Sequence, residues 1–255
     1  MRIALAGLVL NALLTSVALA AIAQYRNPTV GKELALQVPD MHLAAVKSNV
    51  EYASPNGQPL ALDVYRPKDA APDRLLAAVL LVHGTTRDSS PKDWGAYVGW
   101  GQLLAAHGLA GIPFNHRGVA ADVRAALTFV RAEAANLGID ARRICVASFS
   151  GGLALGFRVA LRDPLIRCVL GFYGAPNPRL LRRGSPPVFI AKAGLDSRLI
   201  NNAISAFKRR AVKIRARVRV VTHRRGVHGF DVRNHDARSR EILRQAVSFS
   251  RSHLD

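Results

Sequence analysis

Five short, continuously apolar runs constrain the fold of this chain more than any other feature. They occupy residues 77–82, 109–114, 144–147, 168–172 and 188–191. A strand with one face in water alternates apolar and polar residues, whereas an unbroken apolar run is typical of a strand buried on both faces. Strands of that kind belong to mostly parallel sheets with helices on each side. The runs therefore predict the central strands of such a sheet.

Amphipathic helical patterns separate these runs. One helix face is marked by Val123, Leu127, Val130, Ala134 and Leu137, after which Gly138 ends the pattern. Further helices are expected over residues 152–161, 200–210 and 236–251. Regular alternation of strands and helices predicts an α/β fold, with a mostly parallel twisted sheet and helices on both faces.

Three alternating segments lie outside this pattern. Residues 46–52 and 60–65 flank Pro55-Asn56-Gly57, which predicts an antiparallel hairpin ahead of the parallel strands. Residues 217–221 alternate arginine with valine, as expected for a strand near the edge of the sheet. No repeat, low-complexity stretch or linker interrupts the pattern, so we expect residues 24–255 to form a single domain.

The first 23 residues are typical of a secretory signal peptide. Met1-Arg2 is a minimal basic start, residues 3–17 are mostly apolar, and Ala18-Leu19-Ala20 and Ala21-Ile22-Ala23 are small-x-small cleavage sites. The mature chain would begin near Ala21 or Gln24, in the periplasm or outside the cell. The alternative is an uncleaved N-terminal segment that anchors the protein in the membrane.

The net charge is unusual for such a chain. The 255 residues carry 36 Lys and Arg against 17 Asp and Glu, a formal charge of +19, and residues 179–255 alone hold 19 basic and 5 acidic side chains. A nucleic-acid partner would call for a binding motif or for aromatic residues among the basic runs, and the sequence has neither. We therefore expect a solvated basic face, no nucleic-acid partner, and no membrane contact beyond the export signal.

The chain has two cysteines, which excludes a disulfide-stapled miniprotein and a Cys-rich zinc module. Cys145 and Cys168 fall on neighbouring predicted strands. Export permits a disulfide, but adjacent parallel strands seldom give suitable geometry, so two buried free thiols are expected.

The segment that most clearly indicates chemistry is Ser148-Phe149-Ser150-Gly151-Gly152, which joins a predicted strand to a helix. A serine in such a tight turn projects its hydroxyl above the sheet as a nucleophile, and the residues two before and two after it must be small. Ser148 and Gly152 meet that requirement, although Ser148 replaces the usual first glycine. The alternative role for Ser150 is a helix N-cap.

A nucleophilic serine needs a base and an orienting carboxylate, in the chain order Ser, acid, His. His228 lies in Gly226-Val227-His228-Gly229-Phe230, between the last predicted strand and the final helix, and is preferred to His223, His235 and His253.

The best candidate for the acid is Asp196, which follows a predicted strand and a Gly turn. Asp163 and Asp231 fit this position less well. The alternative role for Asp196 is to cap the next helix.

The oxyanion of an acyl-transfer reaction needs two N–H donors. Gly151 supplies one, and Thr85 in His83-Gly84-Thr85 supplies the other, because this segment directly follows a predicted strand. His83 is interpreted as a buried structural histidine. Trp94, Phe149 and Tyr173 are candidates to line the substrate pocket, whereas a helix packed on the sheet explains Trp100 in the same segment at least as well.

These motifs together resemble the α/β-hydrolases, in particular the branch of dienelactone-hydrolase-like proteins and bacterial esterases. The resemblance rests on the following segments: His83-Gly84, Asn115-His116-Arg117-Gly118, Gly138-Ile139-Asp140, the serine turn, Ala193-Gly194-Leu195-Asp196 and His228-Gly229-Phe230-Asp231. It implies a Ser150–His228–Asp196 triad that hydrolyses esters without a metal or organic cofactor. Dienelactone hydrolases proper use a cysteine where this chain has Ser150, which favours a general carboxylesterase.

Three functions remain open from the sequence. The first is a secreted serine carboxylesterase acting on small esters through an acyl-enzyme. The second is a serine peptidase of the prolyl-oligopeptidase type, although no gating domain accompanies the fold. The third is a non-catalytic binding protein that uses its basic third to hold an anionic polymer or surface. The sequence does not indicate the oligomeric state.

Overall fold

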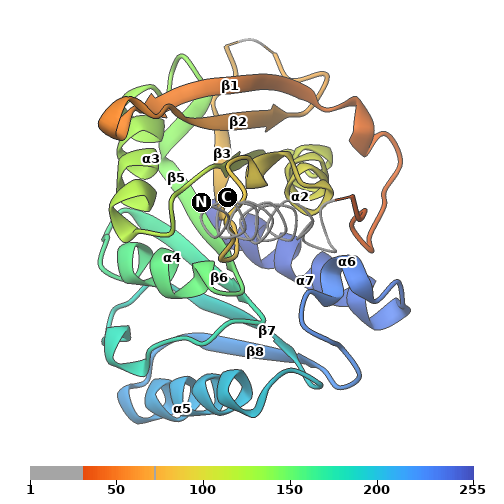
Figure 1. Ribbon diagram of the computed structural model, residues 1–255, viewed down its shortest axis with the longest axis vertical. Coiled ribbons are helices and arrows are strands. Elements are labelled where there is room, and N and C mark those ends of the chain that lie inside the picture. Colours follow the sequence, from red (N-terminus) through yellow and green to blue (C-terminus); the bar gives the residue numbers. More distant parts are fainter. Residues whose placement is uncertain (1–30, 72) are drawn as a thin grey trace, which may run out of the picture.

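The computed structural model describes residues 31–71 and 73–255 and is built on one eight-stranded sheet (Figure 1). The strands are β1 (Ala45–Ala53), β2 (Leu60–Arg66), β3 (Leu76–Val82), β4 (Ala110–Phe114), β5 (Ile139–Phe149), β6 (Ile166–Phe172), β7 (Val188–Ala193) and β8 (Val218–His223). Their spatial order is β1-β2-β4-β3-β5-β6-β7-β8. The β1–β2 and β2–β4 pairs are antiparallel and the other neighbouring pairs are parallel. The predicted mostly parallel sheet with a leading hairpin is therefore confirmed.

Helices cover both faces of the sheet (Figure 1). They are α2 (Gly95–Ala106), α3 (Ala120–Ala132), α4 (Gly152–Ala160), α5 (Arg198–Ile214), the short α6 (Phe230–Arg233) and α7 (Ala237–Leu254). One apolar core contains residues of α3, α4 and α5, and a second contains residues of α2, α6 and α7. Along β3, Ala78, Leu80 and Val82 belong to the first core, whereas Ala77, Val79 and Leu81 belong to the second. This twofold alternation explains why β3 has no polar residue.

The edges of the sheet match the alternating sequence patterns. In the β1–β2 hairpin the turn contains Asn56 and Gly57, both with positive φ. The other edge is β8, which pairs with β7 and exposes Arg219. Charged side chains on an edge strand oppose pairing with a second sheet.

Some boundaries differ from the predicted ones. The apolar stripe from Val123 continues to Leu137, but the α-helix ends at Ala132 and the rest of the stripe forms turns that remain buried. No helix or strand was predicted before residue 46, but Leu34 and Leu36 are buried in the second core, and the Ala35 N–H donates to the Asp231 carbonyl oxygen at 2.6 Å.

The expectation of two free thiols is wrong. Cys145 on β5 and Cys168 on β6 form a disulfide, and both residues are fully buried. A register irregularity between Ile144 and Cys145 brings Cys145 directly opposite Cys168, with the two Cα atoms 4.7 Å apart. That separation lies within the range that a disulfide spans. The argument from ideal parallel strands failed because this local shift changes which residues face each other.

Among the described residues, no helix is both long and apolar enough to cross a membrane. The predicted signal peptide, residues 1–23, lies outside the described residues.

Candidate active site

The turn from β5 into α4 holds Ser150 in a strained conformation. Its φ is 51°, which a residue with a side chain rarely adopts, and its N–H donates to the Phe172 carbonyl oxygen at 2.9 Å. A Cβ atom on Gly152 would overlap the carbonyl oxygen of His83, and Ser148 packs directly against Gly156 of α4. Small residues are therefore required on both sides of Ser150. The capping alternative does not describe this turn, since Gly151 occupies the N-cap of α4 without a side-chain bond.

Ser150, His228 and Asp196 form a continuous chain of hydrogen bonds. The distance from Ser150 Oγ to His228 Nε2 is 2.7 Å, and that from His228 Nδ1 to Asp196 Oδ2 is 2.8 Å. A carboxylate only accepts hydrogen bonds, so Nδ1 carries the imidazole proton and Nε2 accepts from the serine hydroxyl. This is the arrangement in which an imidazole can remove the serine proton.

The sheet brings these three residues together from separate segments. Asp196 follows β7 and His228 lies between β8 and α6. Both residues therefore lie with Ser150 at the carboxyl ends of the parallel strands. The Asp196 side chain is 5% exposed and that of His228 is 39% exposed, so the acid is shielded while the imidazole faces solvent on one side. Ser197, rather than Asp196, caps α5 by accepting from the Ile200 N–H.

Three of the side chains that were ranked lower, His223, Asp163 and His253, bond to other partners. His223 is buried against Asp236, with 3.0 Å between Nε2 and Oδ2, and Asp163 pairs with Arg131. His253, near the end of α7, bonds to the Phe249 carbonyl oxygen through Nδ1.

His83 is a structural residue in the loop after β3. Its ring stacks on His116 with centroids 3.6 Å apart, and its Nε2 accepts from the His116 N–H at 3.2 Å. Burial lowers the pKa of His83 from 6.5 to about 3, with a further contribution from His116. The interpretation of His83 as a buried structural histidine agrees with this geometry.

The two candidate oxyanion donors lie side by side. A Cβ atom on Gly151 would overlap the Thr85 hydroxyl and approach the Thr85 nitrogen to 3.4 Å. The loop that carries Thr85 is fixed by Tyr97 of α2, whose hydroxyl oxygen accepts from the Gly84 N–H at 2.9 Å. Sequence reasoning missed Tyr97, because its position within an apolar helix gave no signal of a polar role.

The three pocket candidates have different surroundings. Phe149 is 1% exposed and belongs to a buried aromatic cluster with Trp100 and Phe172, so it offers no surface to a substrate. Trp94 is also buried, and its Nε1 donates to Asp88 at 2.8 Å. Tyr173 remains beside the site, with its ring 5.0 Å from the His228 ring.

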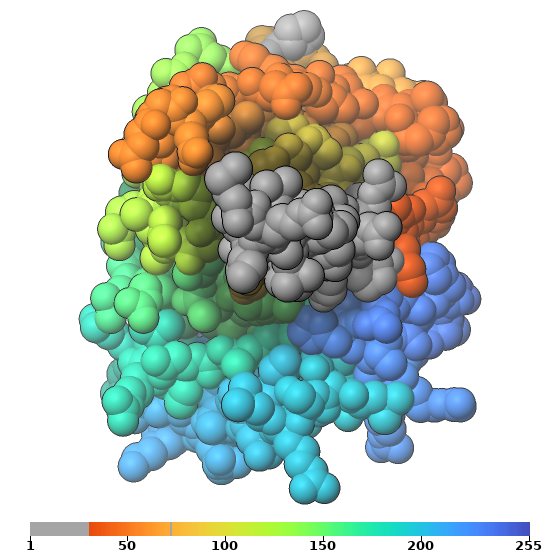
Figure 2. Space-filling view, in the orientation of Figure 1, coloured from red at the N-terminus to blue at the C-terminus, as the bar shows by residue number. Residues whose placement is uncertain are grey.

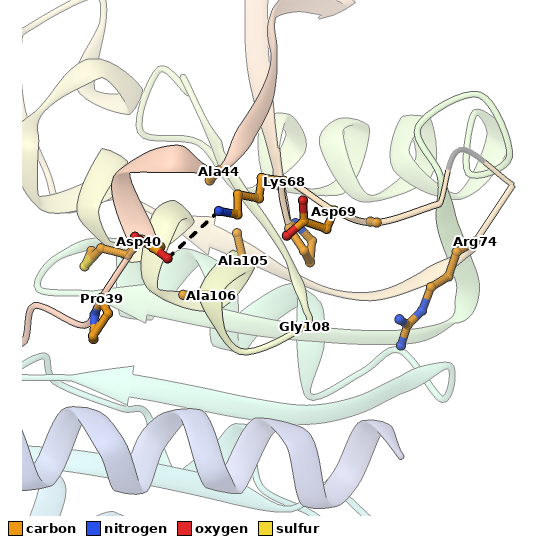
Figure 3. Close-up of a pocket in the computed structure, with 12 residues that line it drawn as sticks. Pro39, Asp40, Ala44, Lys68, Asp69, Arg74, Ala105, Ala106 and Gly108 are labelled. Carbon is orange, nitrogen blue, oxygen red and sulfur yellow. Dashed lines mark ion pairs between the residues drawn. The ribbon is translucent and has the colours of Figure 1, made fainter.

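Several cavities of the described residues lie outside the serine turn. One of about 380 Å³ is lined by residues after β2 and at the end of α2, among them Lys68, which pairs with Asp40 (Figure 3). It lies near the amino ends of the parallel strands, at the other end of the strands from Ser150, because the end of β2 pairs with the start of β4. Another, of about 790 Å³, adjoins the acid loop and is lined by residues that include Leu195, Arg224 and Arg225. Among the described residues, no group of His, Cys, Asp and Glu could hold a metal ion.

Comparison with solved structures shows the fold of known esterases. Esterase 2 of the planctomycete Thermogutta terrifontis, phosphoramylated by tabun, superposes with a TM-score of 0.70 at 20% identity, over 85% of this chain and 97% of that one. The same esterase with bound propionate gives 0.70 at 21% identity, over 84% and 96%. A truncated carbohydrate esterase from gut microbiota gives 0.68 at 17% identity, over 82% and 96%.

Comparison by sequence identifies the family. No curated protein matches the chain. Residues 113–251, more than half of the chain, match the model of the dienelactone hydrolase family. That range includes the serine turn, the acid loop and the base loop described above. With an α/β-hydrolase fold and this match, the chain belongs to the dienelactone hydrolase family.

Proposed function

We propose that this protein is a serine carboxylesterase that hydrolyses small esters through an acyl-enzyme. The observation that carries the proposal is the chain of hydrogen bonds from Ser150 through His228 to Asp196, with Ser150 at a positive φ. Membership of a hydrolase family and the esterase neighbours support the same conclusion. Thermogutta esterase 2 has been solved after phosphorylation by paraoxon. We expect Ser150 to undergo the corresponding covalent chemistry.

The reaction proceeds in two acyl-transfer steps. His228 Nε2 takes the proton of Ser150 as Oγ attacks the ester carbonyl carbon, and the N–H groups of Thr85 and Gly151 bind the oxyanion that forms. The tetrahedral intermediate collapses, and the departing alkoxide takes the proton from His228. Water then gives a proton to His228 and attacks the acyl carbon, which releases the acid and restores the Ser150 hydroxyl. Asp196 holds the imidazole in the required tautomer throughout.

Hydrolysis of p-nitrophenyl acetate tests this function. Ser150→Ala should lower kcat/KM by about 10⁴-fold or more, because the nucleophile is lost. Ser148→Ala is the matched control: this serine is fully buried two residues away, and its loss should leave the activity largely unchanged. Equal activity of the two variants would contradict the proposal. Cleavage of aminoacyl-proline amides in place of esters would identify a peptidase instead.

We further propose that the protein is exported after cleavage of residues 1–23. Proteins outside the cytoplasm commonly carry disulfides, and the Cys145–Cys168 bond is consistent with that environment. The N-terminal sequence of the protein recovered from its producing cells tests this: a chain that begins near Ala21 or Gln24 supports cleavage and export, and an intact Met1 contradicts the cleavage and favours the uncleaved membrane anchor.

A further inference from the structure

A second buried carboxylate lies close behind the proposed base. Asp231 is 0% exposed and follows His228 by one short turn at the start of α6. Its Oδ1 accepts from the Tyr173 hydroxyl at 2.8 Å, and its Oδ2 accepts from Trp100 Nε1 at 3.0 Å. It forms no ion pair with any described residue. A carboxylate buried with only neutral donors is costly and therefore calls for a functional reason.

Tyr173 links this carboxylate to the imidazole. It follows β6 with a φ of 37°, and its N–H donates to the Ala191 carbonyl oxygen at 2.9 Å. Strained backbone of this kind is concentrated at functional sites. The Tyr173 ring packs edge-on against His228, with centroids 5.0 Å apart and an angle of 61° between the rings. Tyr173 is thus held at both ends, by its strained backbone and by Asp231.

We propose that Tyr173 and Asp231 are positioning residues that hold the His228 imidazole between Ser150 and Asp196. Asp196 fixes one ring atom, but 39% of the His228 side chain is exposed, so a packed face is needed to limit rotation of the ring. Tyr173 supplies that face, and Asp231 fixes the hydroxyl of Tyr173. The inference rests on the proposed function, because it assigns a role in the same acyl transfer.

The pair has an electrostatic consequence as well. Burial raises the pKa of Tyr173 well above its ordinary value, so the phenol remains a donor at neutral pH. Burial also raises the pKa of Asp231, while the hydrogen bonds from Trp100 and Tyr173 lower it. Loss of the Tyr173 hydroxyl would favour the neutral acid at Asp231 and remove negative charge near His228. A positive charge on the imidazole would then lose a nearby negative charge that attracts it.

Other charged groups near His228 also contribute to the electrostatic potential at its ring. Asp196 contacts its Nδ1, and Arg233 of α6 donates to its backbone carbonyl oxygen at 3.2 Å. Arg224 and Arg225 precede it on the same loop and are exposed. None of these groups bonds to the Tyr173 hydroxyl, so a Tyr173→Phe variant leaves their contacts in place.

The test is the pH profile of p-nitrophenyl acetate hydrolysis by Tyr173→Phe. We expect kcat to fall about tenfold with little change in KM, because the base is less well placed. We also expect the acid limb of kcat/KM to move to lower pH by about half a unit. Asp231→Asn should shift the acid limb of kcat/KM in the same direction. If Asp231→Asn does not fold, the result for Tyr173→Phe is sufficient to test the positioning role.

Tyr52→Phe is the matched control, since it removes another buried hydroxyl, which donates to the Asn115 carbonyl oxygen at 2.6 Å away from the base. It should lower stability without moving the acid limb. An unchanged kcat and acid limb in Tyr173→Phe, with an active wild type, would overturn the positioning role alone. A wild type without esterase activity would overturn the proposed function and the positioning role together.

Discussion

At the scale of single residues, the backbone strain and hydrogen bonds at Ser150 carry most of the functional meaning. A positive φ at a serine is unfavourable, and it persists here because the small residues Ser148 and Gly152 stand two positions to either side and because the Phe172 carbonyl oxygen accepts the Ser150 N–H. The same loops hold His83, a histidine that is buried and neutral rather than catalytic. The burial of His83 also affects how the free energy of unfolding depends on pH.

His83 should make the protein less stable in acid. Its pKa is about 3 in the folded protein and 6.5 as the ordinary value, so between these values the unfolded chain binds a proton that the native state excludes. The free energy of unfolding should therefore fall as the pH drops below 6.5, by up to about 1.4 kcal/mol per pH unit for this residue. Urea unfolding of wild type and His83→Asn between about pH 4 and 7, within the range over which the native His83 excludes the proton, measures this pH dependence. Identical pH slopes for the two proteins would refute the assignment.

Sequence reasoning grouped the candidate triad because Ser150, Asp196 and His228 each lie in a loop that follows a strand, and a parallel sheet gathers such loops at the carboxyl ends of its strands. It missed side chains whose hydrogen-bond partners are far away in the sequence. Trp100 donates to Asp231 across 131 positions of the chain, and Asp231 was set aside because only its place next to His228 was visible. Periodicity reports the face of an element that is buried, and it does not report which polar atoms meet inside the core.

At the scale of elements, the central strands were predicted well because burial on both faces leaves a sequence without polar residues. The pairing of β5 with β6 was predicted less well. A shift of register near Cys145 is a local departure that no apolar run records, and it determines whether the two cysteines meet. The disulfide joins β5, the strand that precedes Ser150, to its neighbour β6. It therefore cross-links the two strands beneath the site.

Removal of this disulfide should cost stability. The bond closes a loop of 23 residues, for which chain entropy predicts a loss of about 3 kcal/mol in the free energy of unfolding. Urea unfolding of wild type and of the double variant Cys145→Ala/Cys168→Ala measures the difference. Alkylation in denaturant without reductant is the check on the starting material: wild type should show no free thiol, and two alkylated cysteines would show that the bond is absent.

At the scale of the whole molecule, the excess of positive charge is concentrated in residues 179–255, the same part of the chain that carries Asp196 and His228. Residues 179–255, cyan to blue in Figure 2, form the lower part of the face shown. Of their 19 Lys and Arg side chains, Arg238 alone forms an ion pair within the described residues, with Glu241. Residues 1–30 and 72 contain no Asp or Glu, so no further carboxylate is available there. The remaining basic side chains are therefore balanced by solvent and counterions, as expected for a solvated face.

The proposed chemistry depends on one oxygen atom, Ser150 Oγ, and covalent labelling tests its reactivity most directly. A fluorophosphonate reacts with a serine that an adjacent base activates. Peptide mapping by mass spectrometry after labelling should place the adduct on Ser150, and the Ser150→Ala protein should remain unmodified while Ser148→Ala is labelled as wild type is. An adduct on another residue, or folded wild type that is not labelled at all, would contradict the account.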